Sequence, residues 1–180
     1  MTAIATTSLT RQPAALAADL GQSFEQYGFA IVADHGIPVE LIARAQEQAR
    51  ALFALPEEQK RHWHQTGQGG ARGYTPFGIE QAKGATVRDL KEFWHVGREL
   101  PAGDPLEAFM APNIWPDDAL PDFRSTFLEL YARFEQVGAH ILSAIALYLD
   151  LPERWFDPTV DQGNSVLRLL HYPPVPPEAE

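Results

Sequence analysis

Apolar residues recur every three or four positions in three stretches of the chain, a spacing that predicts amphipathic helices. These stretches cover residues 13–28, 38–55 and about 121–150. The third stretch is the strongest, because roughly 28 helical residues would run about 42 Å, and we expect it to brace the domain. Its apolar positions at helical spacing are Phe123, Phe127, Leu130, Phe134, Val137, Ile141, Ile145 and Leu149.

Shorter apolar runs with strand character lie between these helices and after the last one. They are "FAIV" at 29–32, "KEFWHVG" at 91–97 and "GNSVLRLLHYPP" at 163–174. If Phe93 and Trp94 are strand neighbours, alternation predicts that only one of them faces inward. Helices with a few strands predict an α+β fold, here as a single domain of 180 residues.

The glycine-rich segment 66–84 is expected to form a mobile loop or a set of turns. It lacks the Gly-Lys-Ser/Thr ending of a phosphate-binding loop, so a phosphate role has little support. The "HWH" run at 62–64 falls at an expected helix end, where capping and packing outweigh metal binding. No Asp or Glu stands two residues after any of the six histidines, so the chain has no His-x-Asp pair for iron.

Composition and charge exclude several classes of binding partner and of chemistry. The net charge of −10 disfavours nucleic acid and anionic membrane surfaces, and the absence of cysteine excludes disulfides, iron–sulfur clusters and thiol catalysis. The N-terminus has no secretory signal pattern, and no apolar stretch is long enough to span a bilayer. No serine lies in a nucleophile elbow. We therefore expect a cytoplasmic protein with no nucleic-acid or membrane partner.

Seven stretches in order resemble the N-terminal half of the iron(II)- and 2-oxoglutarate-dependent oxygenases, in the isopenicillin-N-synthase-like group. They are "YGFAIVADHGIP", "ALFALPEEQK", "GYTPFGIEQAKG", "DLKEFWHVGREL", "NIWP", the long helix and "LRLLHYPP". The resemblance implies a double-stranded β-helix (jelly-roll) barrel wrapped by N-terminal helices. It also implies Fe(II) and 2-oxoglutarate as cofactors, with ascorbate as a reductant. The implied reaction oxidises a small-molecule substrate and decarboxylates 2-oxoglutarate to succinate.

The chain departs from this family in one respect. The family's His-x-Asp pair, second histidine and Arg-x-Ser lie after the "HYPP" stretch, and this chain stops at Glu180 before all of them. We expect residues 1–165 to form the N-terminal oxygenase region, and 166–180 the first barrel strand and a connector. The chain is then a fragment that needs the remaining C-terminal part of the barrel, and it is expected to be inactive alone.

The resemblance also suggests site residues. A tyrosine at the position of Tyr172 often hydrogen-bonds the cosubstrate or substrate in relatives, whereas Leu170 replaces a frequent asparagine. Alternation puts Arg168 on the same face as Tyr172, so Arg168 is either a donor to a carboxylate or half of a structural ion pair. Tyr74, Phe77 and Phe93 are candidates for the substrate pocket because of their position alone.

Two other functions stay open at this point. One is a truncated, non-catalytic binding or scaffold domain related to these oxygenases. The other is a member that makes ethylene or another unusual product from 2-oxoglutarate. The sequence does not name the substrate, because function depends on the site and not on the fold.

Overall fold

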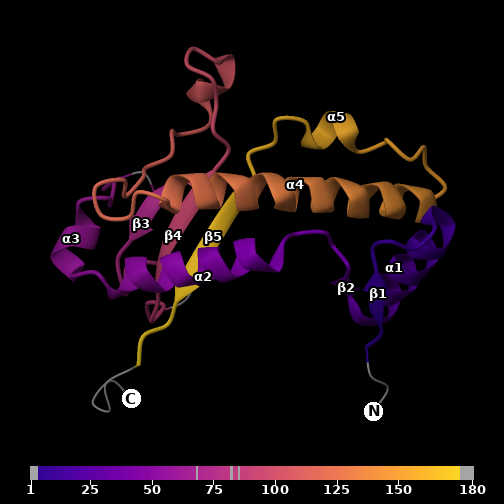
Figure 1. Ribbon diagram of the computed structural model, residues 1–180, viewed down its shortest axis with the longest axis horizontal. Coiled ribbons are helices and arrows are strands. Elements are labelled where there is room, and N and C mark those ends of the chain that lie inside the picture. Colours follow the sequence, from indigo (N-terminus) through magenta and orange to yellow (C-terminus); the bar gives the residue numbers. More distant parts are fainter. Residues whose placement is uncertain (1–3, 68, 82, 85, 175–180) are drawn as a thin grey trace. The chain divides into compact units, whose positions relative to one another are not determined.

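The computed structural model describes residues 4–67, 69–81, 83–84 and 86–174. The chain divides into two compact units, Met1–Pro38 with Ala132–Gly163, and Val39–Tyr131 with Asn164–Glu180. The elements are β1 (Thr6–Ser8), α1 (Pro13–Tyr27), β2 (Ile31–Ala33), α2 (Val39–Ala54), α3 (Glu57–Arg61), β3 (Gly73–Thr75), β4 (Glu92–Gly97), the 3-10 helix η1 (Pro105–Ala108), α4 (Phe123–Tyr148), α5 (Asp157–Val160) and β5 (Val166–His171), labelled in part in Figure 1. Helix and sheet are mixed, as the sequence predicts. The predicted division at 165/166 stays a prediction.

The first unit consists of a short parallel strand pair and the helices beside it. Strands β1 and β2 pair in parallel with Thr7 opposite Val32. Helix α1 is capped by Gly28, whose φ of 77° is the left-handed conformation that glycine adopts readily after a helix. The apolar core consists of Leu9, Leu16, Leu20 and Ala144, with Ala30, Val32, Val137 and Ile141 packed against it. This core holds the ends of β1 and β2 against the second half of α4.

The second unit contains a three-stranded antiparallel sheet in the order β3, β4, β5, with the strands side by side in Figure 1. In its register Trp94 lies opposite Tyr74 and Leu169, and His95 lies opposite Gly73 and Arg168. The strands predicted at 91–97 and within 163–174 are confirmed. Strand β3 lies inside segment 66–84, which was predicted to be a loop, so that prediction is wrong for Gly73–Thr75.

Alternation of side chains gives this sheet two faces. The core face carries Tyr74, Glu92, Trp94, Val96 and His171, and the other face, called the Arg168 face below, carries Thr75, Phe93, His95, Arg168 and Leu170. All six residues of β4 are buried, including Phe93 at 2% and Trp94 at 0% exposure. The alternation expected for these two aromatics is confirmed, since they lie on opposite faces. Both are nevertheless buried, because β4 is the central strand and is covered on both faces.

The core face packs against an aromatic cluster from the helical part of the same unit. The Trp94 ring lies 5.8 Å from Trp63 and 5.5 Å from Phe123, both edge-on, and Phe123 lies 4.3 Å from Phe127. Phe123 and Phe127 belong to the apolar stripe predicted for 121–150, and α4 matches that prediction within a few residues. Packing on this side fixes the position of β4, and thus of the side chains on the Arg168 face.

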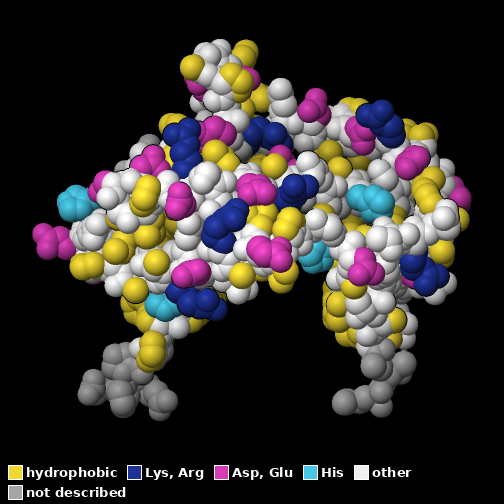
Figure 2. Space-filling view, viewed as in Figure 1, with side chains coloured by type: hydrophobic (Ala, Val, Ile, Leu, Met, Phe, Trp, Pro, Cys, Tyr) yellow, Lys and Arg dark blue, Asp and Glu magenta, His cyan; other side chains and the backbone are white. Residues whose placement is uncertain are grey.

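Acidic and basic side chains are interspersed over the face seen in Figure 2. Among the described residues, no helix combines the length and the apolar character needed to cross a membrane.

Candidate functional site: the Arg168 face of the sheet

A buried histidine occupies the middle of the Arg168 face. The side chain of His95 is 7% exposed. Its Nδ1 lies 2.6 Å from the carbonyl oxygen of Gly70, and its Nε2 lies 2.5 Å from Nε of Arg168. Because a guanidinium can only donate, Nε2 accepts, and Nδ1 carries the proton that it donates to Gly70. His95 therefore ties the glycine-rich segment to Arg168 in one chain of hydrogen bonds.

This arrangement keeps the imidazole of His95 neutral. Burial lowers the pKa of His95 below its ordinary value of 6.5, and the nearby Arg168 cation lowers it further. The hydrogen bond to the Gly70 carbonyl opposes these effects without cancelling them. A neutral His95 leaves Arg168 as the cation of this pair.

The guanidinium of Arg168 is held from three sides and still reaches solvent. Its Cζ lies 4.6 Å from the centre of the Phe93 ring, a cation–π contact, and Nε donates to His95. Nη2 lies 3.4 Å from Oε1 of Glu80, which also pairs with Lys91 at 2.7 Å. The structural ion pair considered for Arg168 is thus present, but it is long. The side chain of Arg168 is 39% exposed, so its outer N–H groups remain accessible to an anion.

Apolar side chains continue this face along β5 and beyond its end. Leu170 is 46% exposed and Tyr172, the residue after β5, is 64% exposed. Alternation places Arg168, Leu170 and Tyr172 on one side of the strand, as expected from the sequence. The face is therefore covered over His95 and open around Leu170 and Tyr172.

The predicted pocket residues do not all lie together. Phe93 lies under Arg168, and Phe77, 38% exposed, stands two residues after β3. Tyr74 lies on the core face, fully buried, with its hydroxyl bonded to Glu92 and to Glu57 at 3.0 Å. Burial, then the hydrogen bond to Glu92, raises the pKa of Tyr74 far above its ordinary value, so its hydroxyl remains protonated.

Two groups of this face were not singled out as site residues from the sequence. His95 could have been chosen because it alternates with Phe93 along "EFWHVG". Thr75 is also buried, and its Oγ1 has no hydrogen-bond partner among the described residues. A buried hydroxyl without a partner is costly, and it marks this face as one that another group could complete.

Iron does not fit the residues present. Among the described residues, no three His, Cys, Asp or Glu side chains cluster closely enough to hold a metal ion. The Arg168 face instead provides N–H groups that can donate to an anion, and an apolar surface lies beside them.

Comparison with known proteins identifies the family. The profile of the "non-haem dioxygenase in morphine synthesis N-terminal" family matches residues 3–118. The chain belongs to this family. It corresponds to the N-terminal part of 2-oxoglutarate/iron(II) oxygenases, as the sequence resemblance predicted.

Individual relatives support this assignment. The 2-oxoglutarate-Fe(II) type oxidoreductase hxnY of Emericella nidulans is 33% identical over 174 residues, which cover 93% of this chain and 50% of hxnY. A 2OG-Fe(II) oxygenase family protein from Caulobacter crescentus has 47% identity and a TM-score of 0.87, over 98% of this chain and 58% of that one. Neurospora crassa T7H in complex with alpha-KG and thymine has 26% identity and a TM-score of 0.79, over 98% and 57%.

These oxygenases are longer than this chain. The chain spans about half the length of the curated relatives that it matches.

Proposed function

We propose that this chain is the N-terminal part of a non-haem iron(II)/2-oxoglutarate-dependent dioxygenase that oxidises a small molecule and converts 2-oxoglutarate to succinate. Family membership supports the reaction class. The complex of T7H with alpha-KG and thymine is an example of a related fold that takes the cosubstrate together with a small molecule. Residues outside these 180 would supply the iron ligands, and the proposal includes ascorbate as reductant and a cytoplasmic location.

The observation that carries this proposal is the open end of the Arg168 face. A partly exposed guanidinium lies on an aromatic ring beside exposed Leu170 and Tyr172. Cations on apolar surfaces of this kind suit carboxylate ligands, which a guanidinium binds through two parallel N–H groups. 2-Oxoglutarate and many small substrates carry such a group.

The sheet edge supports the continuation of the fold. Strand β5 pairs with β4 on one side and, among the described residues, with no strand on the other. An edge strand with alternate apolar residues exposed on one face is a template for further pairing. We infer that the next strands of a double-stranded β-helix would pair here, with the Arg168 face turned to the interior of the barrel. The predicted connector after β5 includes 175–180, which lie outside the described residues.

Each residue then has a role within this proposal. Arg168 binds a carboxylate of the cosubstrate or substrate, and Tyr172 offers a phenol hydroxyl beside it. Phe93 and Phe77 form apolar walls. Tyr74 lies on the core face, so we assign it no contact with substrate.

The first experiment establishes the length of the native protein and its turnover. The protein would be purified from its source through a tag at Met1, weighed by intact mass spectrometry and assayed for succinate with Fe(II), ascorbate, oxygen and 2-oxoglutarate. We expect a protein longer than 180 residues that releases succinate, and no release from residues 1–180 alone. A native protein that ends at Glu180 and releases none would leave a non-catalytic binding domain as the better explanation. Succinate release by residues 1–180 alone would refute the proposed origin of the iron ligands.

A second experiment tests the residues in the active longer form. Tyr172→Phe is expected to raise the KM for 2-oxoglutarate or for the substrate severalfold, because one hydrogen bond is lost. Arg168→Met should raise it further, by about tenfold or more, because a charge-assisted pair is lost. Arg154→Met, which changes an arginine outside the sheet, is the control and should leave both KM values unchanged. Unchanged KM values in both site variants would remove these residues from the site.

A further inference from the structure

A pocket lies in the first unit, at the carboxyl ends of the two parallel strands. It encloses about 330 Å³, within the size range of small-molecule sites. Leu9 follows β1, and the turn Asp34–Ile37 follows β2. The opposite wall is one stripe of α4, Arg133, Gln136, Val137 and His140, whose spacing of three and four residues places them on one side of the helix.

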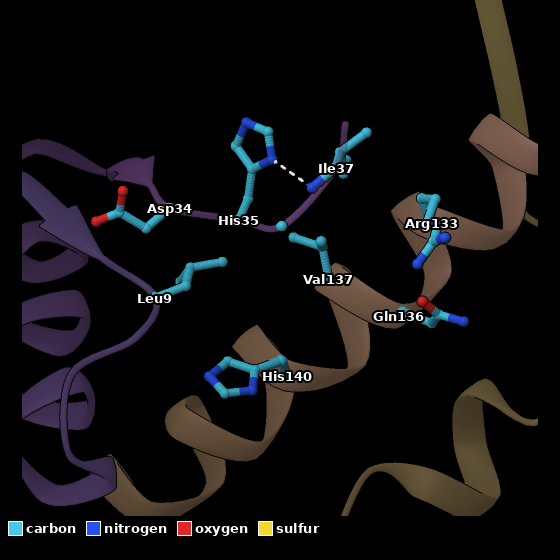
Figure 3. A pocket seen from close by; sticks show the side chains of 9 residues that line it. Leu9, Asp34, His35, Ile37, Arg133, Gln136, Val137 and His140 are labelled. Carbon is cyan, nitrogen blue, oxygen red and sulfur yellow. Dashed lines mark hydrogen bonds between the residues drawn. The ribbon is translucent and has the colours of Figure 1, made fainter. Parts of the chain in front are cut away.

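The floor of this pocket is apolar. Leu9 and Ile37 are 7% and 8% exposed, and Val137 packs against the core cluster to which Leu9 belongs. In Figure 3, Leu9 and Val137 extend toward each other, with His35 and His140 on either side of them. The floor is therefore continuous with the hydrophobic core, and it can receive an apolar group without opening the fold.

The rim supplies hydrogen-bond donors that have no partner among the described residues. Within the described part of the chain, the side chains of Arg133, Gln136 and His140 make no hydrogen bond or ion pair. Nδ1 of His35 accepts the backbone N–H of Ile37 at 3.1 Å, so a proton on the ring resides on Nε2, which is free to donate. A guanidinium, an amide and two imidazoles thus surround one apolar floor.

Asp34, the acidic residue among those that line the pocket, points away from α4. Oδ2 of Asp34 accepts the hydroxyl of Ser8 at 2.5 Å, and Figure 3 shows its carboxylate pointing away from α4. The backbone of Asp34 is left-handed, with φ of 53°, and Gly36 follows with φ of 73°. Residues held in this conformation without being glycine often occur at binding sites. Asp34 keeps its charge but points away from α4, so Arg133 provides the full charge on the α4 side of the rim.

We propose that this pocket binds a small organic molecule with one carboxylate group. The carboxylate is held by Arg133 together with the donors of α4, and the apolar part of the molecule lies on Leu9, Ile37 and Val137. One cation matches one negative charge, and a guanidinium matches the two oxygens of a carboxylate. The apolar floor requires a non-polar part, which an inorganic anion lacks. The site is independent of the proposed oxygenase reaction, because none of its residues belongs to the Arg168 face.

The test is an NMR titration of the ¹⁵N-labelled 180-residue chain with benzoate. Saturable shifts at Leu9, Ile37 and Val137 are expected, with a Kd on the order of 1 mM. Benzyl alcohol has the same ring without the charge, and inorganic phosphate has charge without the ring, so each should bind at least about tenfold more weakly. Shifts that do not saturate, or equal binding of benzyl alcohol or phosphate, would overturn the proposal.

Two variants test whether a loss of benzoate binding comes from the rim residues or from misfolding. Arg133→Met should weaken benzoate binding about tenfold or more, whereas Arg154→Met, at an arginine that is 85% exposed in the same unit, should not. Gln136→Glu, at an exposed helix position, should weaken it as well, because a second carboxylate repels the ligand. Gln136→Glu keeps the test decisive if Arg133→Met fails to fold. Benzoate affinity that is unchanged in the folded variants would refute the site.

Discussion

The two faces of the β3–β4–β5 sheet differ in how exposed their charged side chains are and in how closely these are paired. On the core face, Glu92 is 4% exposed and accepts hydrogen bonds from Lys60 at 2.6 Å, His171 at 2.7 Å and the hydroxyl of Tyr74. On the Arg168 face, the cation is 39% exposed, and its nearest acid lies 3.4 Å away. A charge that is enclosed and fully paired holds a fold together, whereas an accessible one is available to a ligand. The following predictions test this distinction.

The largest effect is expected from Glu92→Gln on the core face. It leaves the ammonium of Lys60, whose side chain is 6% exposed, without its main counter-charge. Removal of one partner from a buried pair costs about 3–5 kcal/mol, and we expect about 3 kcal/mol because Glu57 remains 3.8 Å away. Urea unfolding followed by circular dichroism measures this loss.

Glu99→Gln is the matched control. Glu99 pairs with Arg124 at 2.6 Å, but both side chains are at least one-third exposed. A pair of this kind contributes about 1 kcal/mol or less. Equal losses in the two variants would show that the core face is not the enclosed network described above.

The next effect concerns the covered end of the Arg168 face. A Cβ at Gly97 would lie 2.1 Å from Cζ of Arg72, whose side chain is buried and donates to Asn164 at 2.9 Å. Gly97→Ala must therefore displace a paired cation, at a cost of about 1–3 kcal/mol. Gly138→Ala is the control of opposite sign. Nothing lies within 4 Å of a Cβ there, and alanine inside α4 should stabilise by about 0.5–1 kcal/mol.

The helices could be predicted from sequence because their signals are local. The period of apolar residues and the stop at Gly28 define α1, α2 and α4 within a few residues. Strands β1 and β3, with three residues each, are too short for alternation to show. Their positions depend on distant partners, such as Tyr74 opposite Trp94.

The candidate site was predictable only in part, for the same reason. Alternation alone placed Arg168 and Tyr172 on one side of a strand. The bond between Arg168 and His95 joins residues 73 positions apart, and it follows from a register that no local pattern encodes. Tyr74 was assigned to the pocket because it adjoins the glycine-rich segment, but one step along a strand turns a side chain to the other face.

The two faces should also differ in the pH at which they lose stability. Burial lowers the pKa of His95, so below its ordinary value of 6.5 the unfolded chain binds a proton that the folded chain does not. Stability from this group is present above pH 6.5 and is lost as the pH falls below it. For Glu92, burial raises the pKa, but the bonds from Lys60, Tyr74 and His171 lower it below 4.5 overall. Its contribution is present above pH 4.5 and is lost as the pH falls through the lower, folded value.

Urea unfolding at several pH values between 7 and 4 measures this difference. In His95→Gln, the amide can still donate to Gly70 and accept from Arg168, but it does not titrate. The decrease in stability between pH 7 and pH 5 should therefore shrink, by at most about 1.4 kcal/mol per pH unit, while the decrease below pH 4.5 remains. An unchanged upper part of the profile would mean that folding does not lower the pKa of His95.

The smallest effect is expected from Arg168→Met. The long ion pair and the cation–π contact with Phe93 are partly exposed, so their loss should cost about 1 kcal/mol or less in urea unfolding. Arg72→Met, which removes a buried arginine from the same unit, should cost about 2–3 kcal/mol. A small cost for Arg168 and a large one for Arg72 would mean that the fold does not depend on the exposed guanidinium. If both variants lose the same free energy of unfolding, Arg168 acts as half of a structural ion pair, the alternative that the sequence left open. The proposal that this face binds a carboxylate then loses its main residue.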